Sequence, residues 1–141
     1  MASLFTRIIE GDAPARFVWK DEQCVAFLAL HPLKPGHTLV VPRVEVDHWI
    51  DLDAALMSRL VHVAQIIGIA QRAAFRPEKV ALMIAGLEVR HVHLHLVPIG
   101  DLREMDFGRA DRDPDPVALD EAAARLRAAL LDQGRTEVHG A

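Results

Sequence analysis

Residues 91–97 have the sequence HVHLHLV, in which histidine and an aliphatic residue alternate. Successive side chains of a β-strand project to opposite faces of the sheet. The pattern therefore predicts a strand that has His91, His93 and His95 on one face and aliphatic side chains on the other. The aliphatic face of such a strand can pack on a helix while its imidazoles line a groove.

Further short runs of apolar and β-branched residues predict four more strands. The expected strands are 17–19, 24–30, 38–41, 80–85 and 89–97, the first two forming a hairpin. Residues 86–88 would make a tight connection between the last two strands. Residues 31–36 and 101–115 contain proline and charged residues, which predicts loops.

Two helices are expected from apolar residues that recur at steps of three and four. The first has Asp53 as its expected N-cap and ends near Phe75, before Pro77. The second has Asp115 and Pro116 at its start and Gly134 at its end. Helices that alternate with strands joined by short links predict an α+β fold with an antiparallel sheet.

The composition excludes several classes of protein. The chain has 141 residues, which suits one domain, and its net charge of −4 argues against binding to nucleic acid or to an anionic membrane. Its single cysteine, Cys24, excludes an internal disulfide and suits the reducing cytoplasm, where we expect the protein to act. No uninterrupted apolar run approaches 18 residues, and no signal-peptide pattern is present, so no membrane span is expected.

Three interpretations of the histidine row remain open at this point. It could be an exposed strand face that happens to contain histidine. It could bind a metal through two neighbouring histidines, with the missing ligands supplied by His31, His37 or His48. It could also lie along a phosphate, where one neutral imidazole attacks phosphorus and its neighbours donate hydrogen bonds to the oxygens.

The sequence resembles the histidine triad (HIT) superfamily of nucleotide hydrolases and transferases. The resemblance rests on HVHLHLV, on PLKPGHTLVVPR at residues 32–43, and on LFTRII and VAFLAL at residues 4–9 and 25–30. It covers residues 4 to about 100 and is closer to the Hint branch than to the Fhit branch. It implies a five-stranded antiparallel sheet with two helices, here with an additional C-terminal helix, and a homodimer with a joined sheet.

The domain expected from this resemblance spans residues 1–141. Its core covers about 4–100, a C-terminal loop and helix cover 101–134, and a frayed tail covers 135–141. The resemblance further implies attack by His93 on the α-phosphate of a nucleotide, with His91 and His95 binding phosphate oxygens and His37 bracing the site. The apolar residues that would hold a nucleobase are Leu4, Phe5, Ile8, Phe27 and Leu30. Core packing is the alternative explanation of these residues, and for Ile8 and Leu30 the two explanations weigh equally.

Several positions depart from the family pattern. Many relatives carry an aspartate that binds the ribose where this chain has Ala29. Gly86-Leu87-Glu88 replaces Gly-Gln-Ser, so Glu88 is a candidate general acid if its carboxyl is buried near the phosphate. Otherwise Glu88 would form a salt bridge to Arg90 or be a solvent-facing turn residue, which is the slightly favoured interpretation. Zinc-containing bacterial members have two cysteines at the positions of Ser3 and Thr6, so we expect no structural zinc.

We therefore expect an enzyme that needs no cofactor and acts at the α-phosphate of a nucleotide through a nucleotidyl-histidine intermediate. Its substrate would be a purine nucleotide conjugate: a phosphoramidate, a mixed anhydride or a dinucleoside polyphosphate. One alternative is a nucleotide-binding regulatory module with vestigial catalysis, which Ala29 and Leu87 favour. A metal-dependent enzyme that uses two triad histidines is a further alternative.

Overall fold

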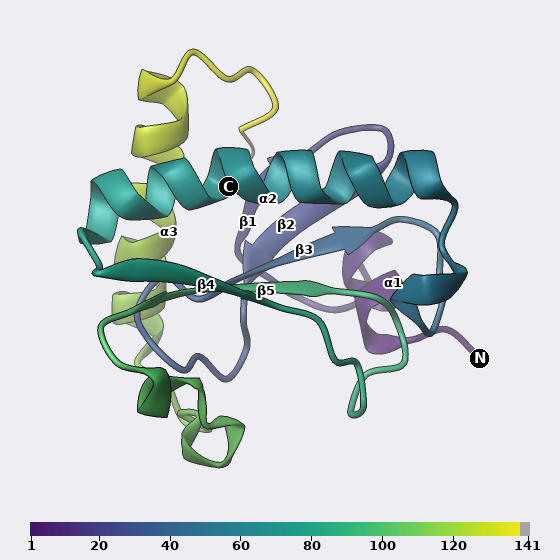
Figure 1. Ribbon diagram of the computed structural model, residues 1–141, viewed down its shortest axis with the longest axis horizontal. Helices are drawn as coiled ribbons and strands as arrows, with labels where there is room; N and C mark the ends of the chain where they lie inside the picture. The colour runs from purple at the N-terminus through teal and green to yellow at the C-terminus, as the bar shows by residue number, and fades with distance from the viewer. Residues whose placement is uncertain (139–141) are drawn as a thin grey trace.

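In the computed structural model, which describes residues 1–138, five strands form one antiparallel sheet with the order β1-β2-β3-β5-β4 (Figure 1). The strands are β1 (Phe17–Lys20), β2 (Cys24–Leu28), β3 (Thr38–Pro42), β4 (Lys79–Met83) and β5 (Leu94–Ile99). The α-helices are α1 (Leu4–Ile9), α2 (Ala54–Phe75) and α3 (Pro116–Asp132). The predicted α+β class and five-stranded antiparallel sheet are confirmed.

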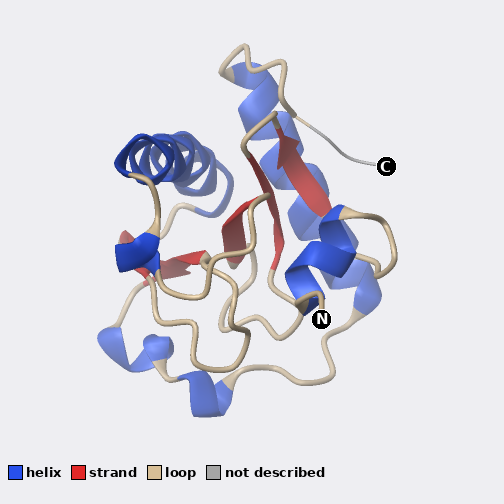
Figure 2. Cartoon of the chain, turned by 90° about the vertical axis from the view of Figure 1, so that its right-hand side faces the viewer, coloured by secondary structure: helices blue, strands red, loops and turns tan. Residues whose placement is uncertain are grey.

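The sheet separates two apolar clusters, and β2 shows how alternation builds both. Cys24, Ala26 and Leu28 pack in the larger cluster beneath α2 and α3, whereas Val25 and Phe27 pack in the smaller cluster with α1. Figure 2 looks almost along α2 and shows it well separated from α1, with strands between the two. All five side chains of β2 are buried, and so are all five of β3, the middle strand of the sheet, so these two strands contribute to the core on both faces.

The predicted N-caps of the two long helices are confirmed. The Asp53 side chain accepts a hydrogen bond from the amide of Leu56 at the start of α2, and Asp115 does the same for Val117 at the start of α3. The α2 helix ends where Arg76 takes a left-handed conformation with φ 49°. By length and composition α2 is apolar enough to cross a membrane, but here it packs along β3, β4 and β5 as a core helix does.

The predicted strand over 89–97 is wrong at its start, because β5 begins only at Leu94. Residues 84–93 form the link from β4, so the predicted tight connection at 86–88 is wrong as well. The amide of Val92 donates to the carbonyl of Val46, a residue outside the sheet, and this holds the segment away from the β4–β5 ladder. His91 and His93 therefore lie in a loop that leads into the strand, and only His95 lies in the strand itself.

Two expectations about the C-terminal third also change. The loop at 101–115 contains two short 3₁₀ turns, Leu102–Met105 and Phe107–Arg109. The tail predicted to be frayed pairs with the sheet edge, since the amide of Lys20 donates to the carbonyl of Glu137 at 3.0 Å and Val138 forms a bridge with Trp19. The part of that prediction that concerns residues 139–141 lies outside the described residues.

Candidate active site

The ring of His91 is buried, and the protein uses both of its nitrogens. Its Nε2 lies 2.8 Å from the carbonyl oxygen of Pro42, which can only accept, so Nε2 carries the proton. Its Nδ1 then accepts from the hydroxyl of Ser3, whose Oγ lies 2.7 Å away. The expectation that His91 binds a phosphate oxygen stays a prediction, but in this arrangement both ring nitrogens already have protein partners.

The neighbouring ring of His93 has the opposite tautomer. Its Nδ1 lies 2.7 Å from the backbone carbonyl oxygen of His91 and must donate to it. In the neutral ring this leaves Nε2 unprotonated, with a lone pair available to attack an electrophile. The backbone of His91 thus selects the tautomer of His93 that a nucleophile requires.

His37 and His95 form a directed pair at the other end of the row. The backbone amide of Leu33 can only donate, and it lies 3.0 Å from Nδ1 of His37, so the His37 proton is on Nε2. That Nε2 lies 3.0 Å from Nδ1 of His95 and donates to it. The His95 proton is consequently on Nε2, where it can serve as a hydrogen-bond donor to an anion.

The environment keeps these four rings neutral. Burial, together with the smaller effect of the charge that His93 would carry, lowers the pKa of His37 to about 4. Burial, followed by the effects of His93 and His37, lowers the pKa of His95 to about 3. Burial is also the main cause that lowers the pKa values of His91 and His93, against the hydrogen bonds to carbonyl oxygens that favour their charged forms. Near neutral pH the row is a set of uncharged rings with fixed donors and acceptors.

The rings of the site form a series of pairwise contacts. The ring centroids of His93 and His95 are 4.8 Å apart, and Phe5 lies 4.8 Å from His93 on the side of α1. Phe107 lies 4.8 Å from His95 at the opposite end, and 6.4 Å from His37. The contact of Phe107 with the histidines could not be predicted, because nothing in the local sequence distinguishes Phe107 within the charged loop at 101–115.

The predicted nucleobase residues divide between core and surface. Phe5, Ile8 and Phe27 are buried in the smaller cluster, and Leu4 packs against it while half-buried. Leu30 lies outside that cluster with 37% of its surface exposed. In this conformation core packing accounts for Ile8 and Phe27, and Leu4 and Leu30 are the members of the set that offer surface to a ligand.

The departures from the family pattern have clear structural positions. Ala29 is buried against the smaller cluster, and its amide donates to the carbonyl of His37. Glu88 is exposed on the link between β4 and β5, as are Leu87 and Arg90. In the single chain, the side chain of Glu88 is therefore not buried as a general acid at this position would need to be.

A family model described as the HIT domain matches residues 10–101. The chain belongs to the HIT family. The match covers every strand of the sheet and all four histidines discussed above, so the histidines that form the candidate site all lie within the HIT domain.

Two relatives cover most of this chain, and a third covers about two thirds of it. An uncharacterized HIT-like protein of Methanocaldococcus jannaschii is 32% identical over 130 residues, which cover 88% of this chain and 98% of that protein. The crystal structure of a zinc-bound histidine triad family protein from Mycobacterium smegmatis is 31% identical, with a TM-score of 0.80 over 96% of this chain and 99% of that one. An adenylylsulfatase of Arabidopsis thaliana is 24% identical over 100 residues, 67% of this chain and 51% of the plant protein.

The expected absence of structural zinc stays a prediction. Ser3 and Thr6 present neutral hydroxyls, which are poor zinc ligands beside thiolate and imidazole. Among residues 1–138, no group of three or more His, Cys, Asp and Glu side chains is placed to hold a metal ion. The interpretation as a metal-dependent enzyme that uses two triad histidines therefore has no support from residues 1–138 of this structure.

Proposed function

We propose that this HIT protein transfers or hydrolyses nucleotidyl groups at the α-phosphate of a nucleotide conjugate. The observation that carries the proposal is the pair of tautomers at the centre of the row. His93 has an unprotonated Nε2, whereas the neighbouring His95 has a protonated one. A nucleophile beside a hydrogen-bond donor is the arrangement that attack on a phosphoryl group requires.

In the proposed first step, Nε2 of His93 attacks the α-phosphorus. The N–P bond forms, the bond from phosphorus to the leaving group breaks, and the leaving group departs with the electron pair of that bond. His93 then carries a positive charge, which its Nδ1–H shares with the carbonyl oxygen of His91 at 2.7 Å. His95 donates from Nε2 to a phosphoryl oxygen, and His37 holds that donor in place.

In the second step, water attacks the same phosphorus and the N–P bond breaks. The electron pair returns to Nε2 of His93, the nucleoside monophosphate leaves, and the water proton passes to solvent. An alcohol or phosphate in place of water would make the protein a transferase. Neither step uses a metal or an organic cofactor.

The proposed ligand is a purine nucleotide or nucleotide conjugate. The phosphate chemistry of the histidine row and the name of the plant relative, an adenylylsulfatase, support this class. Ala29 has no carboxylate for the ribose hydroxyls, so ribose recognition must use other groups. Leu4 and Leu30, which keep accessible surface, are the proposed apolar contacts to the base.

The experiment is hydrolysis of adenosine 5′-phosphoramidate by the wild type and by His93→Ala and His93→Asn. We expect both variants to lose turnover while circular dichroism shows an intact fold. Turnover that survives in His93→Ala would end the proposal. Loss of activity together with loss of the fold would be resolved by His93→Asn, whose amide can replace the Nδ1–H donor to the His91 carbonyl.

A nucleotide-binding regulatory module with vestigial catalysis is the second candidate, and Ala29 together with the exposed Leu87 favours it. Calorimetry with AMP and GMP beside a panel of phosphoramidates, mixed anhydrides and dinucleoside polyphosphates separates the two candidates. Tight binding without turnover of any substrate class supports the module. Turnover of one class supports the enzyme, and failure to bind either nucleotide removes both candidates.

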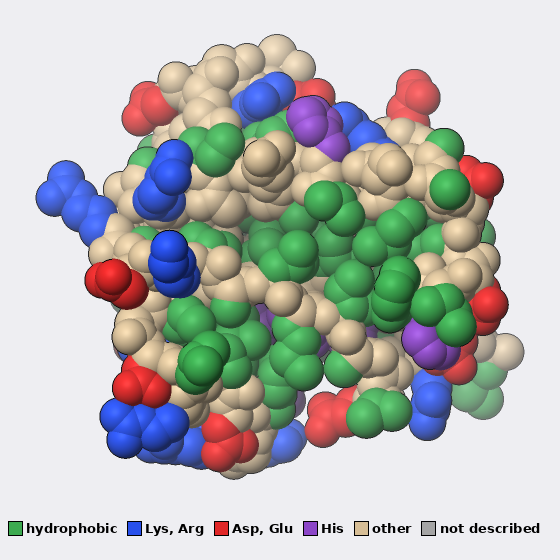
Figure 3. Space-filling model, viewed as in Figure 1, with side chains coloured by type: hydrophobic (Ala, Val, Ile, Leu, Met, Phe, Trp, Pro, Cys, Tyr) green, Lys and Arg blue, Asp and Glu red, His purple; other side chains and the backbone are tan. Residues whose placement is uncertain are grey.

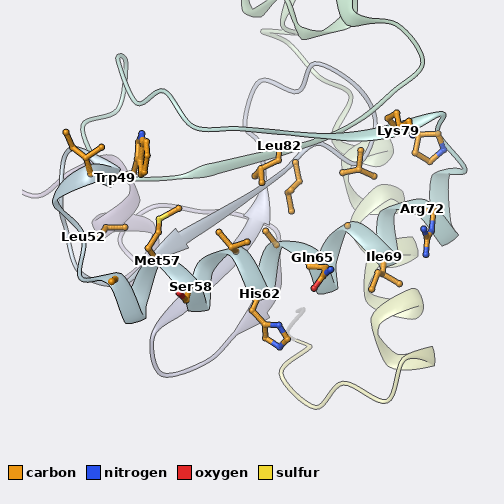
Figure 4. Close-up of a pocket in the computed structure, with 18 of the residues that line it drawn as sticks. Trp49, Leu52, Met57, Ser58, His62, Gln65, Ile69, Arg72, Lys79 and Leu82 are labelled. Carbon is orange, nitrogen blue, oxygen red and sulfur yellow. The ribbon is translucent and has the colours of Figure 1, made fainter.

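We also propose that the protein forms a homodimer through α2 and β4. Strand β4 is an edge of the sheet, so its outer backbone groups can pair with a second strand. A groove of about 1220 Å³ lies between α2, β4 and the turn at Trp49–Asp51 (Figure 4). Large apolar side chains line it, and the space-filling view shows them as a broad patch across the centre of this face (Figure 3).

A two-fold axis through this patch would place β4 against β4 of the second copy and would cover both grooves at once. The exposed fractions of Val61, Ile69 and Leu82 are 44%, 41% and 51%, which is unusual for clustered aliphatic residues. We expect light scattering to show a dimer, and Leu82→Lys to shift it to monomer. A wild type that stays monomeric at micromolar concentration would refute this part.

The cytoplasm is the proposed location, which the lone, buried Cys24 supports.

A further inference from the structure

Four polar side chains meet between the N-terminus and the segment that follows β3. The backbone amide of Ser3 and the hydroxyl of Thr6 both donate to the same carboxylate oxygen of Glu45, each at 2.7 Å. The Oγ of Ser3 lies 2.7 Å from Nδ1 of His91, and the Oγ1 of Thr6 lies 3.4 Å from the same nitrogen. Residues about 40 and 90 positions apart in sequence thus share one hydrogen-bond network.

The direction of each bond in this network is determined. Nε2 of His91 carries the proton, so its Nδ1 accepts and the Ser3 hydroxyl donates. The Ser3 Oγ in turn accepts the amide of Thr6 at 3.0 Å, as the N-cap of α1. Glu45 accepts from both ends of this turn, and these hydrogen bonds lower the pKa of Glu45 to about 2.

The network continues to the proposed nucleophile. The backbone carbonyl of His91 accepts from Nδ1 of His93 at 2.7 Å, so the position of residue 91 sets the position of the His93 ring. The ring of Phe5, from the same turn of α1 as Ser3 and Thr6, contacts both His91 at 5.9 Å and His93 at 4.8 Å between centroids. A displacement of α1 would therefore reach both rings.

We propose that Glu45, Ser3 and Thr6 form a positioning relay, which fixes the ring of His91 and, through its backbone carbonyl, aligns Nε2 of His93 for attack. This inference rests on the proposed function for its catalytic consequence, but the alignment of the two rings is a property of the free protein. The three residues touch neither the phosphate nor the reacting atoms, so they act as positioning residues. The side chains of Ser3, Thr6 and Glu45 would thus orient the His91 ring through hydrogen bonds.

The test uses Glu45→Ala and Thr6→Val, because neither removes the Oγ that caps α1, as Ser3→Ala would. Glu45→Gln and Thr6→Ser are the conservative partners, since the amide oxygen and the hydroxyl keep the acceptor and the donor. Glu121→Ala, at an exposed position on α3, is the matched control. Two measurements are made on each: kcat and KM for adenosine 5′-phosphoramidate, and the ring ¹⁵N chemical shifts of His91 and His93 in the ligand-free protein.

We expect Glu45→Ala and Thr6→Val to lower kcat about tenfold with little change in KM, since a misplacement of about 1 Å can cost roughly a hundredfold. Their ring shifts at His91 and His93 should move, and the two conservative variants should return both readouts toward the wild type. Ring shifts in Glu45→Ala that match those of Glu121→Ala would overturn the relay, as would moved shifts with unchanged kcat. If the wild type turns over no substrate, the proposed function fails, while the ring shifts still decide whether the relay exists.

Discussion

Acidification from pH 6.5 toward pH 4 is expected to destabilise this protein through His37. The folded protein keeps the His37 ring neutral with a pKa of about 4, because the ring is buried, whereas the unfolded chain takes up a proton near pH 6.5. Between these values the unfolded state binds more protons, so stability is complete above pH 6.5 and falls as the pH drops. With about 1.4 kcal/mol for each pH unit of difference, His37 alone contributes a loss of about 3 kcal/mol.

The assay is urea unfolding at several pH values between 7 and 4, for the wild type and for His37→Gln. The glutamine does not titrate, so the variant should lose about 3 kcal/mol less than the wild type over this range. His48→Gln, at an exposed position, is the control and should keep the wild-type slope. A wild-type stability that is flat from pH 6.5 to 4.5, or a His37→Gln slope equal to that of the wild type, would refute the reasoning.

Three further predictions concern the support of the site. The acid limb of kcat/KM should lie below pH 6.5, because burial lowers the pKa of His93 and only the neutral ring attacks; a limb above pH 6.5 would contradict this. Gln71→Met should cost about 1–3 kcal/mol in urea unfolding for each carbonyl it leaves unpaired, since the buried Gln71 amide donates to the carbonyls of Gly36 and Leu96. Gly36→Ala should destabilise the loop before His37 by more than about 1 kcal/mol, because φ is +85° and a Cβ there would overlap the ring of Phe75 at 2.4 Å; an unchanged melting temperature would disprove it.

The sequence was sufficient to predict the class of fold and the faces of the central strands. Alternation in residues 91–97 correctly separated the histidines from the aliphatic residues, and Val92, Leu94 and Leu96 do pack in the larger cluster. The start of β5 could not be predicted, because the bond from the amide of Val92 to Val46 depends on how the chain folds around residue 46. Local propensity contains no information on such a contact.

The roles within the site divide in the same way. The sequence pointed to His37, His93 and His95 as site residues. It also predicted that His91 binds the phosphate, whereas in the structure the two ring nitrogens of His91 form hydrogen bonds with Ser3 and Pro42. Neither partner can be inferred from the histidine motif, since Ser3 lies 88 residues away in the chain. The packing of Phe107 on His95 was equally unpredictable, because a charged loop gives no periodic signal of what it covers.

The central claim is that Nε2 of His93 becomes covalently bonded to phosphorus, and trapping this species tests it most directly. Wild-type protein mixed with adenosine 5′-phosphoramidate and quenched in base within the first turnovers would be digested and analysed by mass spectrometry. The account predicts an adenylyl adduct on the peptide that contains His93, and none in His93→Asn. Turnover with no adduct at any quench time, or an adduct on another residue, would contradict it.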